Sequence, residues 1–129
     1  MNTFGKEKFF RWVLLRHTGA PDDKGGIHFD FLLEDKDFCR TWRLNKIPLL
    51  DGPYVSSVYI APHNLYWLDI EEKVVSGNRG VATRLKKGIV LEFLPSVENS
   101  FVNLSIKWGD VKSNLVIDEN GCKIFCKKY

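Results

Sequence analysis

The chain has 129 residues, of which 44% are hydrophobic, and its formal net charge is +3 at pH 7. This length supports one hydrophobic core and leaves little room for a second, so we expect one domain over residues 1–129. The 19 basic and 16 acidic residues permit an anionic partner, but they exclude the strongly basic class of proteins that coat nucleic acid.

Short β-rich segments separated by turn signals predict a small, mainly β fold, which we expect to be a closed or partly open β-barrel with short helical turns. The first expected strand is residues 9–17. The Gly- and Asp-rich residues 18–26 predict a loop that leads into a second strand at residues 27–34. A hairpin of these two strands would bring His17 near His28.

The remainder of the chain predicts further short strands and turns. A charged turn precedes an expected strand at residues 38–44, and residues 54–60 fit either a strand or one helical turn. We expect more strands at residues 65–70, 80–85, 89–94 and 101–108. An Asn-Gly pair is a strong hairpin signal, and here it joins residues 115–117 to residues 123–126.

The cysteines and the apolar runs indicate a cytoplasmic protein without a membrane partner. Cys39, Cys122 and Cys126 are odd in number and match no zinc or redox spacing, so we expect reduced thiols. No apolar run approaches the roughly 18 residues that a membrane span needs. The first eight residues lack the apolar stretch of a signal peptide.

Residues 27–34 carry the strongest chemical signal in the sequence. Side chains alternate between the faces of a strand, so His28 and Asp30 share one side. A histidine and a carboxylate at this spacing can bind one divalent cation. His17 and His63 are the other histidines in the chain and could complete such a site.

Five motifs follow one another along the chain, at residues 9–17 (FFRWVLLRH), 28–34 (HFDFLLE), 41–44 (TWRL), 63–71 (HNLYWLDIE) and 75–80 (VSGNRG). In this order they resemble the 3′-phosphoesterase domain of bacterial DNA ligase D, and most of all its short stand-alone relatives. The resemblance implies a compact β-barrel enzyme of DNA repair. It also implies manganese, with zinc or cobalt as alternatives, and the trimming of 3′-phosphates and 3′-terminal ribonucleotides to a 3′-hydroxyl.

The same resemblance implies roles for individual residues. His17, His28 and Asp30 take the metal-ligand positions, and His63 takes the position of a histidine that serves the reacting phosphate. A cation would withdraw charge from the phosphoryl oxygens, and His63 could donate a hydrogen bond or protonate the leaving group. The implied partners are DNA or RNA 3′ ends and a DNA ligase or other end-joining proteins.

The sequence departs from the ligase-attached enzymes where they carry phosphate-clamping arginines, because Leu32 and Val55 stand at those two positions. Arginine makes planar, bidentate contacts to phosphate that an aliphatic side chain cannot replace. We therefore expect slower catalysis, a different substrate, or other basic residues in this role. The candidates for that role are Arg16, Arg40, Arg43, Lys46, Arg79 and Arg84.

Other interpretations of these residues stay open. Two histidines and one carboxylate also form the facial triad of non-haem iron oxygenases. A non-catalytic nucleic-acid or protein-binding module that lost turnover would explain the missing arginines. Glu34 shares the His28 face of its strand and could orient a site histidine. The tryptophans, which are Trp12, Trp42, Trp67 and Trp108, fit core packing better than base stacking.

Overall fold

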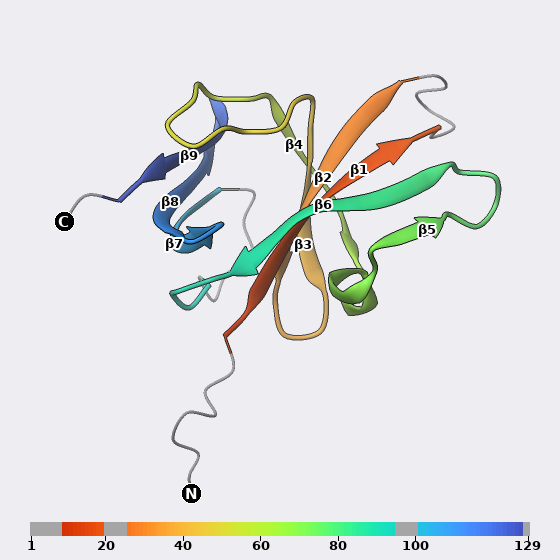
Figure 1. The fold of residues 1–129 in the computed structure, drawn as a ribbon, viewed down its shortest axis with the longest axis horizontal. Helices are drawn as coiled ribbons and strands as arrows, with labels where there is room; N and C mark the ends of the chain where they lie inside the picture. The colour runs from red at the N-terminus through yellow and green to blue at the C-terminus, as the bar shows by residue number, and fades with distance from the viewer. Residues whose placement is uncertain (1–8, 20–25, 95–100, 128–129) are drawn as a thin grey trace, which may run out of the picture.

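The computed structural model describes residues 9–19, 26–94 and 101–127, and Figure 1 shows their fold. This part of the chain contains nine strands and one short 3-10 helix, η2. The strands form two antiparallel sheets, one of six strands and one of three. The prediction of a mainly β fold is confirmed, and the described strands do not form a closed barrel.

The large sheet has the strand order β4-β3-β2-β1-β6-β5. Its strands are β1 (Arg11–Thr18), β2 (Ile27–Glu34), β3 (Cys39–Leu44), β4 (Ser57–His63), β5 (Glu72–Val74) and β6 (Val81–Ile89), and η2 (Leu65–Asp69) follows β4. The small sheet consists of β7 (Val102–Trp108), β8 (Val111–Asp118) and β9 (Gly121–Cys126), in that order. In the view of Figure 1 the small sheet lies on one side of the twisted large sheet, and η2 lies on the other.

Two stretches of the fold differ from the expected pattern. Residues 65–70 are not a strand, because the Asn64 side chain accepts a hydrogen bond from Tyr66 N at 3.0 Å and caps a helical turn. The two strands expected at residues 80–85 and 89–94 are replaced by the continuous strand β6, which ends at Ile89. The expected loop at residues 18–26 lies mostly outside the described residues. Residues 1–8, where we expected no signal peptide, lie outside them entirely.

The main hydrophobic core lies between the two sheets and centres on Trp12. Its ring stacks on Phe31 and Trp108, at centroid distances of 5.4 and 4.8 Å. The indole Nε1 donates a hydrogen bond to the carbonyl oxygen of Lys107 at 3.0 Å, as a buried indole N–H requires. The other large side chains that the central strands of the large sheet bury here are Leu14, Leu33, Trp42 and Leu44. Core packing of Trp12, Trp42 and Trp108 is confirmed.

A smaller apolar cluster covers part of the opposite face of the large sheet. Val13, Leu15, Leu32 and Cys39 pack together there beneath Leu68 of η2. Alternation along the strands explains this second cluster, since Trp12 and Leu14 of β1 and Phe31 and Leu33 of β2 face the main core on the other side. The strand face that carries His28 and Asp30 is therefore buried at one end by η2.

Isolated backbone pairs join the two sheets at both edges of the small sheet. Val55, which precedes β4, exchanges hydrogen bonds of 2.9 and 2.8 Å with Cys122 of β9. Val90, which follows β6, pairs with Ile106 of β7. These pairs hold the small sheet against the segments next to β4 and β6 of the large one.

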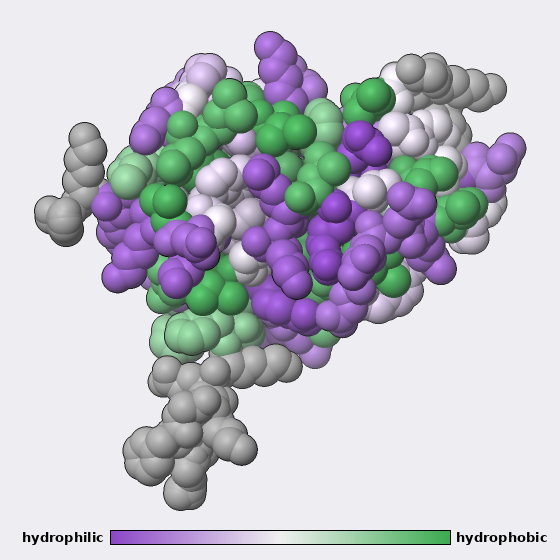
Figure 2. Space-filling model, in the orientation of Figure 1, coloured by the Kyte–Doolittle hydropathy of each residue, from purple (hydrophilic) through white to green (hydrophobic). Residues whose placement is uncertain are grey.

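The surface drawn in Figure 2 is mixed in character. Hydrophilic side chains gather over its middle and its right half, and hydrophobic side chains lie among them in small groups. Within the described residues, no helix has the length and apolar character that a membrane crossing requires.

Gly80 allows the turn between β5 and β6 to pass close to the end of β1. Its φ is +89°, and a Cβ atom there would lie 1.9 Å from the Thr18 carbonyl oxygen, whereas Gly109 has a φ of +63° and nothing within 4 Å. An L side chain is strained at both positions, by about 1–2 kcal/mol. We predict that Gly80→Ala lowers the free energy of unfolding in urea clearly more than Gly109→Ala. Equal losses would contradict the close approach.

Candidate metal centre and adjoining cavity

The metal-ligand candidates come together through the antiparallel pairing of β1 with β2. In this register His17 lies directly opposite His28, and Leu15 lies opposite Asp30. The two imidazole rings meet edge to face, with their centroids 4.8 Å apart. The prediction that a hairpin brings these two histidines together is confirmed.

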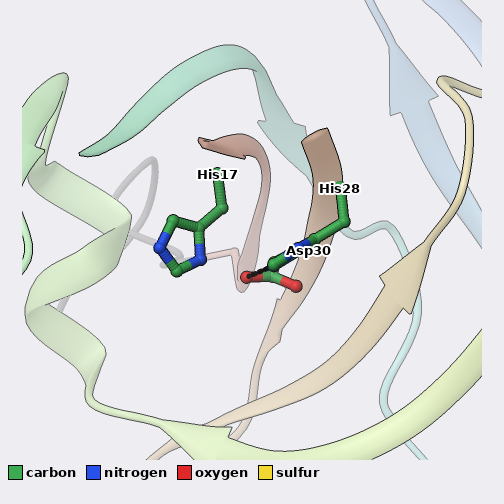
Figure 3. Close-up of side chains that lie close together, drawn as sticks. All are labelled: His17, His28 and Asp30. Atoms are coloured by element: carbon green, nitrogen blue, oxygen red, sulfur yellow. Dashed lines mark ion pairs between the residues drawn. The ribbon is translucent and has the colours of Figure 1, made fainter. Parts of the chain in front are cut away.

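His17, His28 and Asp30 form a group that could hold a metal ion. Each offers one ligand atom, and these three atoms all lie within 4.8 Å of one another. His28 Nε2 is 3.7 Å from Asp30 Oδ2. Figure 3 shows His17 of β1 on one side of the Asp30 carboxylate, while His28 and Asp30 both extend from β2. Imidazole and carboxylate donors of this kind suit several divalent transition metals.

Two buried polar atoms of this group have no hydrogen-bond partner in the described part of the chain, and a bound cation would provide one for both. His28 and Asp30 are only 5% and 4% exposed. Neither His28 Nε2 nor Asp30 Oδ1 has a hydrogen-bond partner among the described residues. An unsatisfied buried polar atom costs roughly 1–3 kcal/mol, and more when it is charged. A bound cation would satisfy both atoms, so the residues present fit a metal ion.

A backbone carbonyl fixes the orientation of His17. Its Nε2 lies 2.6 Å from the carbonyl oxygen of Arg79. A carbonyl oxygen only accepts hydrogen bonds, so Nε2 carries a proton, and in the neutral ring this leaves the lone pair of Nδ1 for a cation. In Figure 3 one ring nitrogen of His17 points toward Asp30 and the other points away. Metal-binding histidines usually have such a partner on their second nitrogen.

His63 reaches the same carboxylate from the end of β4. Its Nε2 lies 4.0 Å from Asp30 Oδ2, on a strand that does not supply the three-residue group. Burial lowers the pKa of His63 from its usual 6.5, although the Asp30 carboxylate acts in the opposite direction. His63 is therefore mostly neutral at pH 7, and a neutral imidazole can still donate one N–H to a substrate oxygen.

A cavity of about 360 Å³ opens beside the candidate ligands. Its lining includes His17, Asp30 and His63, so it gives a substrate access to the group. The remaining polar and aromatic side chains around it come from β3, η2, β5 and the following turn, and they are Arg43, Tyr66, Trp67, Lys73, Ser76 and Arg79.

Two of the six basic residues predicted to contact phosphate line this cavity. Arg43 lies opposite Asp30 on β3, and its Nε is 4.0 Å from Asp30 Oδ1. Arg79 lies in the turn between β5 and β6, where its guanidinium donates hydrogen bonds to Ser76 at 2.7 and 3.2 Å. Of these two, Arg43 is the one whose side chain forms an ion pair with a candidate ligand.

The other four predicted phosphate contacts lie elsewhere. Arg16 is exposed, and strand alternation places it on the face opposite His17. Arg40 is buried in an ion pair with Asp35 at 2.7 Å. Lys46 is exposed in the bend after β3, and Arg84 donates to a backbone carbonyl of η2 at 3.2 Å. None of these four side chains lines the cavity.

Glu34 and the two positions without arginine also lie away from the cavity. Glu34 stands at the far end of β2 and accepts a hydrogen bond from Arg11 N at 2.8 Å, so it anchors the start of β1 and not a site histidine. Leu32 is fully buried in the apolar cluster under η2, and Val55 belongs to the main core.

Three cavity residues had no functional signal in the sequence. Tyr66 and Lys73 lie on η2 and β5, two elements that hydrophobic patterning did not predict. Trp67 was assigned to the core, and it does pack against the smaller cluster, but it also lines the cavity. The Asn64 cap was the one local signal that could have placed the two aromatic residues on a helical turn.

A scan against protein-family models finds no match for this chain, and a search of the curated proteins finds none either.

Proposed function

We propose that this protein is a divalent-metal-dependent 3′-phosphoesterase that processes 3′-phosphate or 3′-ribonucleotide ends of DNA during repair. The observation that carries the proposal is the convergence of His17, His28 and Asp30 beside a cavity that also exposes His63. The ordered motifs that resemble the ligase D domain support this choice of reaction. We expect manganese as the metal, the cytoplasm as the location, and a DNA ligase or other end-joining protein as the partner.

Each site residue has a distinct role in this proposal. His17, His28 and Asp30 would hold the cation, which when bound withdraws charge from the phosphoryl oxygens and lowers the pKa of a water molecule. His63 would donate a hydrogen bond to a phosphate oxygen from the other side of Asp30. Arg43 would make the charge-assisted phosphate contact that Leu32 and Val55 cannot make.

A partly open barrel is the finer architecture that we propose. Pairing passes from the end of β6 into β7 through Val90 and Ile106. It passes from β9 to the segment before β4 through Cys122 and Val55. These isolated bridges support a barrel that is only partly open, because each junction of the two sheets is joined by isolated pairs and not by a continuous strand ladder.

A non-catalytic nucleic-acid-binding module is the second candidate function. The burial of Leu32 and Val55 favours it, because neither position offers a contact to phosphate. Such a module would bind metal and 3′ ends through the same cavity without releasing a product.

The metal centre can be tested by thermal unfolding. Manganese, zinc or cobalt should raise the midpoint, because a ligand that binds the folded state stabilises it, by about 2.7 kcal/mol at 100 times its Kd. His28→Ala should abolish this rise, and His63→Ala should retain it. Scanning fluorimetry across a metal titration measures both. A His28→Ala protein that responds as the wild type does would contradict the proposed ligands.

The proposed reaction can be tested on a labelled primer-template that ends in a 3′-phosphate or a 3′-ribonucleotide. We expect a 3′-hydroxyl product with manganese and none with a chelator. His63→Ala should slow the reaction roughly 100-fold or more, since it removes a donor that acts on the reacting phosphate. Binding of the DNA without any product would favour the non-catalytic module. An unchanged rate in the variant would remove His63 from the mechanism.

The role of Arg43 can be tested against Arg16, which is exposed on the other face of the sheet. At saturating manganese, Arg43→Ala should lower kcat/KM by two to three orders of magnitude, which corresponds to about 3–4 kcal/mol of transition-state stabilisation. Arg16→Ala should leave it unchanged. Equal effects of the two substitutions would show that Arg43 is not the phosphate contact.

A further inference from the structure

Two adjacent aromatic side chains of η2 line the cavity. Tyr66 is 48% exposed, and its ring centroid lies 5.1 Å from that of Trp67. Trp67 also packs against the smaller apolar cluster, and its ring centroid lies 6.4 Å from that of His63. Tyr66 therefore contacts a tryptophan that is itself packed in place, and about half of the surface of Tyr66 stays exposed.

The backbone of η2 holds these rings in place before any ligand arrives. Asn64 caps the turn by accepting the hydrogen bond from Tyr66 N, and Leu68 anchors its underside in the apolar cluster. A ligand that stacks on Tyr66 would then lose little affinity to ordering of the protein. None of the roles assigned to the ligands, His63 or Arg43 accounts for this open ring.

Positive charge and metal donors share the cavity with the aromatic pair. Lys73 and Arg79 line it together with Arg43, and two of the candidate metal ligands, His17 and Asp30, line it as well. Binding sites for unpaired nucleic acid combine basic groups that contact the backbone with aromatic rings that stack on bases. The chemistry of this cavity therefore matches a nucleotide, which has both a charged phosphate and a flat base.

The size of the cavity limits how much of a nucleic acid can enter. Its volume of about 360 Å³ is near the lower end of the roughly 300–1,000 Å³ that ligand pockets span. One nucleotide suits that volume better than a base pair. A base inside a duplex also has its faces covered by its neighbours, so it must leave the stack before it can stack on a side chain.

We propose that Tyr66, supported by Trp67, stacks on the terminal base of an unpaired 3′ end while the phosphate of that end reaches the metal donors. The preferred substrate is then a single-stranded or frayed 3′ end and not a blunt duplex. This inference rests on the proposed function for the identity of the reacting group, and it adds the recognition of the base.

Equilibrium binding separates this inference from catalysis. The probe is a 5′-labelled DNA strand that ends in a 3′-phosphonomethyl group, whose carbon–phosphorus bond phosphate hydrolysis does not break. A matched strand has an abasic terminal residue. Fluorescence anisotropy with the manganese-loaded full chain gives the affinities of the wild type and of Tyr66→Ala, Tyr66→Leu and Tyr66→Phe.

We expect Tyr66→Ala and Tyr66→Leu to weaken binding of the strand with a terminal base by about 5- to 150-fold, the range found when alanine replaces one stacking ring. Tyr66→Phe should bind as the wild type does, because the ring remains. All four proteins should bind the abasic strand alike. The wild type should bind the single strand more tightly than a blunt duplex with the same end.

Equal affinity of the wild type and Tyr66→Ala for the strand with a terminal base would overturn the inference. An equal loss on both strands would also overturn it, because the ring would then not contact the base. Tight binding of the blunt duplex would overturn the preference for unpaired ends. Failure of the proposed reaction looks different, since Tyr66-dependent binding would persist while the 3′-phosphate strand gave no product with manganese.

Discussion

The antiparallel register of β1 with β2 is the constraint on which the site depends. His17 and His28 face each other only in this register, and a slip of one residue would turn one strand's donors toward the main core. The core prevents that slip, because Trp12 and Phe31 are buried on the other face of the same two strands. Packing on one face of the sheet thus positions the donor atoms on the opposite face.

The site also brings together buried polar atoms that lack hydrogen-bond partners within the described part of the chain, and each such atom lowers the stability of the fold. His28 and Asp30 each bury an atom without a hydrogen-bond partner among the described residues. An unsatisfied buried polar atom destabilises the fold, and a bound cation would remove that penalty, so metal binding at this group would stabilise the folded state. His17 does have a partner, because its Nε2 donates a hydrogen bond to the carbonyl oxygen of Arg79. Arg79 belongs to the turn that Gly80 allows to pass close to the end of β1. The turn therefore links the cavity wall to the candidate ligands.

The metal group could be predicted from the sequence because its geometry is local. Alternation along one strand places His28 beside Asp30, and a single hairpin adds His17. The cavity could not be predicted in the same way. The Asn64 cap overrides the strand-like pattern of the residues after it, and β5 is a strand of three exposed residues formed by pairing with β6. The sequence also could not show which arginines line the cavity, because that depends on the strand face that each side chain occupies and on the ion pairs that it forms.

The central claim is that His17, His28 and Asp30 bind one divalent cation. The most direct measurement is an anomalous difference map from a crystal of the protein grown with zinc. The account predicts one strong peak between the three side chains, at roughly 2.0–2.2 Å from a nitrogen of each histidine and an oxygen of Asp30. A map with no peak there, or with zinc bound only at other residues, would contradict it.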